Sequence, residues 1–287
     1  MSRRIKVILS IALVALLIAG LCLAVILNID KIYVFAENNG WFRNEMAVVK
    51  TNQNGLVAVP LDELENMENI TLDQSMMLIN KQNHLPDDFV PSISEYKDTT
   101  VFMNDCMLSA YESFSAAVKA KTGNKLYVSS DFRTADEQAA LYDADPLTAT
   151  EVGASEHQSG LALDVYVARY AGDAFIKSPS GRFVGSNSWK YGFIIRYPSY
   201  AEDITGIRYE PWHIRYVGHP HADVIYNNQT TLEEYVESLE IGVWYEIDGY
   251  LVSRQNSVDG CILLPQEFSS CTVSPDNTGA YIITVRK

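Results

Sequence analysis

Two short motifs bring together residue types that bind metals. His157 and Asp164 lie in the segment Ser-Glu-His-Gln-Ser-Gly-Leu-Ala-Leu-Asp, and Glu210 precedes His213 by three positions in Glu-Pro-Trp-His. Catalytic zinc is held by three protein ligands chosen from His, Asp, Glu and Cys, and its fourth position is left to water. His157, Asp164 and His213 complete such a set. The pattern therefore predicts a hydrolytic zinc site.

The second motif supplies a base, and a candidate oxyanion partner lies earlier in the chain, in the segment Ser-Ser-Asp-Phe-Arg that ends at Arg133. Zinc lowers the pKa of a bound water to about 7, and the carboxylate of Glu210 could accept its proton and pass it to a departing amine. The oxyanion that develops on an attacked carbonyl needs a positive or hydrogen-bonding partner besides the zinc, and Arg133 is the best candidate because it is always charged. A surface salt bridge is the alternative interpretation of Arg133.

A single histidine is more often a structural residue than a ligand, so the prediction depends on the grouping of the two motifs. Gly160 and Ala162 are small, and they allow close backbone approach between the first histidine and the aspartate. His219 and His221 form a second pair, and either could replace His213 as a ligand. They are less suited to this role because neither has an acid at the spacing seen before His213.

Composition limits the class of protein. The chain has 287 residues, of which 47% are hydrophobic, enough for one large domain or for one domain with an appendage. Its formal net charge of -14 argues against nucleic acid as the main partner, because neutralising phosphates requires clustered Lys and Arg.

The N-terminus carries an apolar run without a charge, residues 7–27, which is long enough to cross a bilayer as a helix. Arg3, Arg4 and Lys6 precede the run, so the positive-inside bias leaves residues 1–6 in the cytoplasm and the rest outside the cell membrane. A cleaved signal peptide is the alternative, but no small-x-small cleavage site follows the run.

Periodicity and turn residues divide the remainder of the chain. Residues 28–75 are polar and mixed, and they indicate a stalk or N-terminal extension with some strands; residues 240–287 indicate a small β appendage. The elements expected between and within these segments are helices at 101–121, 134–142 and 232–239 and strands at 126–128, 161–167, 193–197, 213–217, 243–252 and 281–285.

Cys261 and Cys271 flank a short segment near the C-terminus. An oxidising exterior permits a disulfide between them, and cysteines ten residues apart can equally remain free thiols. Spacing alone leaves both alternatives open.

At the residues described above, the sequence resembles the VanY-type D-alanyl-D-alanine carboxypeptidases, which are related to VanX dipeptidases and to cell-wall LD-carboxypeptidases. The resemblance covers residues 76–239, and its motifs include Leu85-Pro86, the segment from Arg133 to Gln138, the segment from Ser155 to Asp164, Tyr191-Gly192-Phe193, Arg196-Tyr197-Pro198 and Glu210-Pro211-Trp212-His213. It implies an α+β fold, a small antiparallel sheet with packed helices and a zinc cleft on the sheet.

The resemblance also implies roles for individual residues. Zinc would be held by His157, Asp164 and His213, with Glu210 as general base and Arg133 on the carbonyl oxygen. Gln138 and Ser155 fall where the family contacts the terminal carboxylate of the substrate.

One departure from the family concerns the residues before Arg133. The family usually has Ser-Gly-Tyr-Arg, and this chain has Ser-Asp-Phe-Arg, so Asp131 adds a negative charge that could pair with Arg133.

The function implied is that of a membrane-anchored zinc carboxypeptidase that removes the C-terminal D-alanine from peptidoglycan stem peptides or their precursors. A contribution to glycopeptide resistance is an extension of this role. An LD-carboxypeptidase or an endopeptidase that acts on the same polymer would share the ligands and the base. A non-catalytic wall-binding module is the alternative from another class, and an intact Glu210 argues against it.

Overall fold

A computed structural model describes residues 2–147 and 149–287, and it divides the chain into two compact units, Met1–Phe42 and Arg43–Lys287. The first unit consists of helix α1 (Arg3–Leu27) and helix α2 (Ile29–Asn38). Within the described residues, α1 is the one helix long and apolar enough to span a membrane, and a signal sequence near the N-terminus would meet the same criteria.

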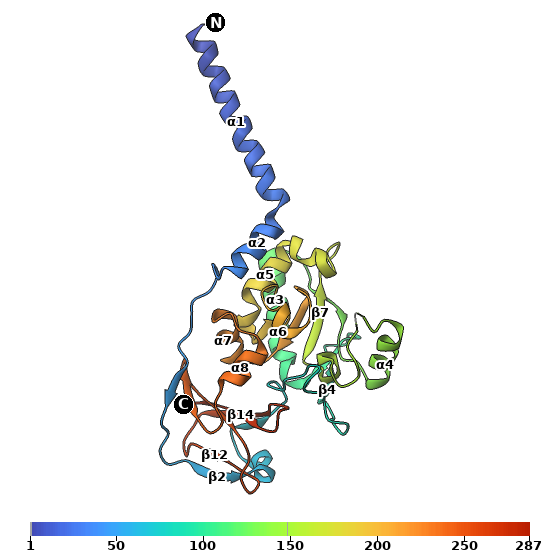
Figure 1. Cartoon of the computed structure of the whole chain (residues 1–287), viewed down its shortest axis with the longest axis vertical. Helices are drawn as coiled ribbons and strands as arrows, with labels where there is room; N and C mark the ends of the chain where they lie inside the picture. The colour runs from blue at the N-terminus through green and yellow to red at the C-terminus, as the bar shows by residue number, and fades with distance from the viewer. Residues whose placement is uncertain (1, 148) are drawn as a thin grey trace. The chain divides into compact units, whose positions relative to one another are not determined.

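The second unit mixes short helices and strands, which confirms the α+β class (Figure 1). Its α-helices are α3 (Leu108–Thr122), α4 (Ala135–Ala144), α5 (Pro179–Asn187), α6 (Glu202–Thr205), α7 (His221–Asn227) and α8 (Leu232–Ser238). Its 3-10 helices are η1 (Leu61–Asn66), η2 (Asp105–Met107), η3 (Glu156–Ser159), η4 (Gly172–Lys177) and η5 (Ser188–Tyr191). Its strands are β1 (Val49–Thr51), β2 (Val57–Pro60), β3 (Ile70–Leu72), β4 (Ile93–Glu95), β5 (Phe102–Asn104), β6 (Tyr127–Ser130), β7 (Ala162–Tyr166), β8 (Phe193–Ile195), β9 (His213–Tyr216), β10 (Trp244–Ile247), β11 (Tyr250–Gln255), β12 (Cys261–Leu264), β13 (Ser270–Pro275) and β14 (Tyr281–Arg286).

A four-stranded antiparallel sheet in the order β6-β7-β9-β8 carries both metal-binding motifs. Helices α3 and α5 pack against it through a core that includes Phe114, Val184, Leu163 and Phe193, and Figure 1 shows both helices beside β7. These apolar side chains face the helices, so the ends and the opposite side of the strands are left for polar residues.

A second, six-stranded sheet has the order β1-β10-β11-β14-β13-β3. Its outer strands β1 and β3 come from the segment expected to form a stalk, and β3 pairs in parallel with β13. Strand β2 from the same segment pairs with β12. The N-terminal extension and the C-terminal segment therefore form one β structure, a long-range pairing that the local sequence pattern did not indicate.

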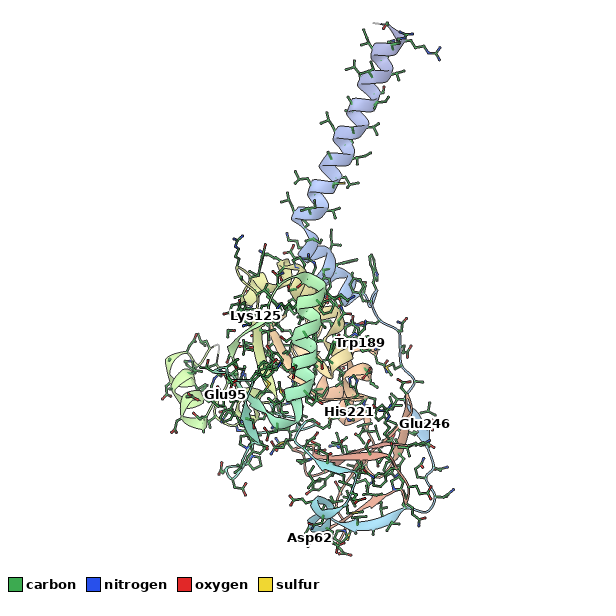
Figure 2. All side chains as sticks on the ribbon, turned by 180° about the vertical axis from the view of Figure 1, so that it is seen from behind. Asp62, Glu95, Lys125, Trp189, His221 and Glu246 are labelled. Atoms are coloured by element: carbon green, nitrogen blue, oxygen red, sulfur yellow. The ribbon has the colours of Figure 1, made fainter. Side chains whose placement is uncertain are left out.

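The six-stranded sheet shares its core with helices α7 and α8, which follow strand β9 in the chain. Ile225 of α7 and Tyr235 of α8 belong to the same buried cluster as Ile247, Val252 and Ile282 of the sheet. At this junction the imidazole of His221, labelled in Figure 2, is bonded to the hydroxyls of Tyr235 and Thr284 at 2.8 Å each. The C-terminal strands are thus part of the same hydrophobic interior and are not peripheral to it.

Most of the expected elements are confirmed. Helix α3 confirms the C-terminal part of the helix predicted at 101–121, but the start of that prediction is wrong, because residues 102–107 form strand β5 and the 3-10 helix η2. Helix α4 begins with a capping box in which Thr134 and Glu137 bond each other's backbone N–H groups. The predicted strand at 243–252 is two strands, β10 and β11, which are joined by a turn at Asp248-Gly249. Helix α5 was not expected, because its sequence, Pro-Ser-Gly-Arg-Phe-Val-Gly-Ser-Asn, is poor in helix formers.

The cysteines of the C-terminal segment are free thiols. Cys261 begins β12 and Cys271 lies on β13, and these strands belong to different sheets. The disulfide alternative is therefore not realised in this structure.

Candidate active site

The four-stranded sheet brings Asp164 and His213 side by side. Asp164 on β7 is paired directly with His213 on β9, so both side chains emerge on the same face. Asp164 Oδ1 lies 3.1 Å from His213 Nδ1 and 3.6 Å from His157 Nε2. Ligand atoms around a tetrahedral zinc ion are separated by roughly 3.3 Å when the bonds are about 2.0–2.1 Å long. The three side chains are therefore spaced as the ligands of one ion would be.

His157 is oriented by the loop that precedes α4. Its Nδ1 lies 2.9 Å from the carbonyl oxygen of Asp131, which can only accept, so Nδ1 carries the proton. The N–H of Arg133 returns a bond to the carbonyl of His157 at 3.1 Å. Nε2 is thereby left with a lone pair directed at Asp164.

His213 directs its Nδ1 toward Asp164, whereas His157 directs its Nε2. The Nε2 of His213 lies 3.4 Å from Oε2 of Glu156, a buried carboxylate. The rings of His157 and His213 are nearly perpendicular, at 85°, with centroids 5.0 Å apart. One histidine thus offers Nε2 and the other Nδ1 to the same point.

Gly160 shapes the turn between the first histidine and the aspartate. Its φ is +69°, and an added Cβ would lie 2.3 Å from the side chain of Ile93 and 3.0 Å from the backbone nitrogen of Asn104. The N–H of Asn104 donates to the Gly160 carbonyl at 2.9 Å. The close approach at this glycine is to the β4–β5 region, which the sequence did not indicate.

The donor set fits a metal ion. Oδ1 of Asp164 is buried and has no hydrogen-bond partner among the described residues, a state that buried polar atoms rarely adopt unless something else binds them. His157, Asp164 and His213 place one ligand atom each within 4.8 Å of one another, and no other group in the described part of the chain does so.

The alternative ligands lie elsewhere. His219 Nδ1 bonds the carboxylate of Asp223, and both nitrogens of His221 are occupied by hydroxyls in the shared core.

The electrostatics of the site favour a cation. Burial raises the pKa of Asp164, but the adjacent imidazoles of His157 and His213 outweigh it and hold the pKa well below its usual range. Burial lowers the pKa of His213, whereas Asp164 and Glu156 raise it to a net value of about 9. A positive charge placed between these carboxylates is therefore strongly stabilised.

Glu210 lies next to the candidate ligands His157, Asp164 and His213 but is not one of this group. The N–H of His213 donates to the Glu210 carbonyl at 3.1 Å, and this turn brings Oε2 of Glu210 to 3.9 Å from His213 Nδ1. Burial, reinforced by the charge of Asp164, raises the pKa of Glu210. A carboxylate with a raised pKa next to the metal-binding atoms is suited to accept a proton.

Arg133 is neither a surface residue nor paired with Asp131. Its Nη1 donates to Gln138 Oε1 at 2.7 Å and its Nη2 to Ser130 Oγ at 2.8 Å. The carboxylate of Asp131 instead accepts from the N–H of Phe102 at 2.6 Å. These two bonds hold the guanidinium in place, and Arg133 also lines a cavity of about 420 Å³ that none of the three candidate ligands lines.

The two remaining predicted residues are Gln138, which contacts Arg133, and Ser155, which is close to His157 in the chain. Gln138 is buried, and its Nε2 donates to the carbonyl of Thr150 at 2.5 Å while its oxygen holds Arg133. Its amide is therefore engaged within the protein. Ser155 is buried and lies two positions before His157, at the N-terminus of η3.

A buried ionic network behind His213 was missed in the sequence. It consists of Glu156, Arg196 and Arg215, all fully or almost fully buried, together with Glu233 of α8. One feature of the sequence could have indicated this network. Arg215 lies two positions after His213 on a predicted strand, so both side chains must lie on the same face of the sheet, and the cross-strand neighbour of Arg215 is the small Ala162.

Two imidazoles, one carboxylate ligand and a second carboxylate at the side are typical of the catalytic zinc sites of peptidases. The family model of VanY, D-alanyl-D-alanine carboxypeptidase, matches residues 100–219, which contain all of these side chains.

Comparison with individual proteins agrees with this match. The chain is 37% identical over 201 residues to a Bacillus subtilis protein named "Putative carboxypeptidase YodJ", covering 63% of this chain and 71% of that one. It is 34% identical over 182 residues to the bifunctional D-Ala-D-Ala dipeptidase and D-Ala-D-Ala carboxypeptidase VanXYC of Enterococcus gallinarum, covering 57% of this chain and 95% of that one. The solved structure of the LdcB LD-carboxypeptidase is similar with a TM-score of 0.53 and 31% identity, covering 69% and 99% of the two chains. The chain belongs to the VanY family of D-alanyl-D-alanine carboxypeptidases.

Proposed function

We propose that this protein is a zinc-dependent D-alanyl-D-alanine carboxypeptidase that removes the C-terminal D-alanine from peptidoglycan stem peptides or their precursors. The observation that carries the proposal is the convergence of His157, Asp164 and His213 on one point with Glu210 at its side. The family description and the activity named for VanXYC support the choice of substrate.

In this proposal His157, Asp164 and His213 would hold the zinc ion through the atoms that converge in the site. When bound, zinc lowers the pKa of a water molecule and polarises the scissile carbonyl. Glu210 accepts the proton of the attacking water and later delivers it to the amine of the departing D-alanine. Its raised pKa and its position 3.9 Å from His213 Nδ1 suit both transfers.

Arg133 provides the positive charge for the carbonyl oxygen. Gln138 and Ser130 fix its two terminal nitrogens, so the guanidinium is oriented before the substrate arrives. We place Gln138 and Ser155 at the end of the site that receives the terminal carboxylate, where Gln138 acts through Arg133 because its own amide is engaged.

The location of the substrate accords with an anchored enzyme. We propose that residues 7–27 span the cell membrane, that residues 1–6 are cytoplasmic and that the catalytic domain, residues 76–239, lies outside with its flanking segments 28–75 and 240–287. Peptidoglycan and its lipid-linked precursors are exposed on that side. Removal of terminal D-alanine there would also reduce the target of glycopeptide antibiotics.

The test uses the full-length protein in detergent with zinc, incubated separately with a stem pentapeptide that ends in D-Ala-D-Ala and with the matching tetrapeptide. Mass spectrometry should show loss of one alanine from the pentapeptide. Glu210→Gln should retain zinc and lose turnover. Turnover that is unchanged in zinc-loaded Glu210→Gln would contradict the catalytic assignment, and firm muropeptide binding without zinc or turnover would favour a wall-binding module.

A second candidate, an LD-carboxypeptidase, is favoured by the similarity to LdcB. The two enzymes would share the ligands and the base and would differ in the residue before the scissile bond. Loss of D-alanine from the tetrapeptide alone would establish this alternative and reject the first.

A further inference from the structure

We infer that Glu156 is a positioning residue that fixes which nitrogen of His213 binds the metal. The inference rests on the proposed zinc site and adds a residue to it. Glu156 directly precedes His157 in the chain, yet its side chain reaches the other histidine, with Oε2 3.4 Å from His213 Nε2. The carboxylate is completely buried, so no solvent competes for this contact.

Two arginines hold the carboxylate of Glu156 in one orientation. Arg196 Nε donates to Oε1 at 2.7 Å, and Arg215 Nη1 donates to the same oxygen at 2.6 Å. Both donors approach Oε1, so Oε2 is the oxygen that faces His213. Two guanidinium groups within hydrogen-bond distance of one oxygen pair with the carboxylate of Glu156 in its charged form.

Groups outside the four-stranded sheet hold Arg196 and Arg215 in place. Arg215 Nη2 donates to the carbonyls of Ser75 and Met77 at 2.9 and 2.7 Å. Arg196 forms a bidentate pair with Glu233 of α8, at 2.9 and 2.5 Å. The network thus contains two guanidinium groups and two carboxylates, and its charges balance within the buried region.

A histidine that binds a metal ion is in its neutral form, which has one N–H and one lone pair. Because an ionised carboxylate only accepts, Glu156 requires the proton of His213 on Nε2 and so directs the lone pair of Nδ1 toward Asp164 and His157. Carboxylates that orient metal-binding histidines in this way typically contribute 10- to 100-fold to metal affinity.

Two substitutions test the contact in complementary ways. Glu156→Gln keeps an oxygen for the arginines but turns an NH₂ donor toward His213, which favours the Nδ1–H form and blocks the metal-binding nitrogen. Glu156→Asp keeps the charge that the two arginines need, while its shorter side chain withdraws the second oxygen from His213. Glu233→Gln is the matched control, because it removes a carboxylate from the same network at Arg196 without a contact to His213.

Zinc affinity is measured by chelator competition on the full-length protein, and the visible spectrum of the Co²⁺-substituted protein reports the ligand geometry. We expect both Glu156 variants to lose about 10- to 100-fold in zinc affinity and to show an altered Co²⁺ spectrum. Glu233→Gln should keep the affinity and the spectrum of the wild type, even if it unfolds at a lower temperature.

Folded Glu156 variants that bind zinc within twofold of the wild type would overturn the inference, as would an equal loss in Glu233→Gln. If neither Glu156 variant folds, the ¹⁵N shifts of the wild-type zinc protein decide: a protonated Nε2 on His213 supports the inference and a protonated Nδ1 rejects it. A wild-type protein that binds no zinc would instead overturn the proposed function, and the inference with it.

Discussion

The buried histidine at the junction of helices and sheet should make the protein sensitive to acid. His221 is fully enclosed, and Tyr235 and Thr284 occupy its two nitrogens. Burial, assisted by the charge of nearby His219, lowers its pKa to about 3. The folded state therefore keeps His221 neutral at a pH where the unfolded chain already binds a proton.

The sign and the size of the effect follow from this difference. Stability from His221 is fully present above its unfolded pKa of about 6.5 and is lost as the pH falls toward the folded value of about 3. Each pH unit in this window costs about 1.4 kcal/mol, so acidification from pH 7 to pH 5 should remove about 2 kcal/mol through this residue.

The assay is urea unfolding of the full-length protein in detergent at pH 7 and pH 5, followed by tryptophan fluorescence. His221→Gln is the comparison, because glutamine can bond both hydroxyls and does not titrate. The variant should lose about 2 kcal/mol less than the wild type between the two pH values, while other titrating groups, including the His219–Asp223 pair, contribute equally to both proteins. Equal losses would refute the reasoning.

Three further predictions concern the site itself. Glu210→Gln should lower kcat by roughly 10²- to 10⁴-fold with zinc content unchanged by metal analysis, and a variant that lost its zinc instead would show that Glu210 is a ligand. A strong chelator should abolish D-alanine release and added zinc should restore it, whereas full activity after verified metal removal would exclude the metal mechanism. Gly160→Ala should lower the free energy of unfolding by about 1–3 kcal/mol, because the new methyl group would clash with Ile93 and Asn104 at a left-handed φ; an unchanged melting temperature would show that the β4–β5 region yields without cost.

The candidate site was predictable because its information is local. The Ser-Glu-His and Glu-Pro-Trp-His motifs each place a ligand and a polar neighbour within a few residues, and the expected strands at 161–167 and 213–217 are the adjacent strands β7 and β9. Adjacency of two ligand-bearing strands was enough to bring Asp164 and His213 together.

What the sequence did not predict depends on long-range contacts. The pairing of β1 with β10 and of β3 with β13 is set by the fit of whole strands, which short segments of mixed polarity do not specify. The role of Glu156 was hidden for a related reason. Its neighbour in the chain is the candidate ligand His157, while the turn directs its carboxylate to His213 and to two arginines that are distant in sequence.

Because one sheet pairs N-terminal strands with C-terminal strands, it limits when during synthesis the polypeptide can fold. Strands β1 and β3 are synthesised long before β10 and β13, so they emerge with unsatisfied backbone groups and must wait for the C-terminus before they can pair. Folding of such a topology cannot proceed vectorially from the ribosome and is expected to be slow. A polypeptide terminated before β10 would contain His157, Asp164 and His213 and still lack the strands with which β1 and β3 pair.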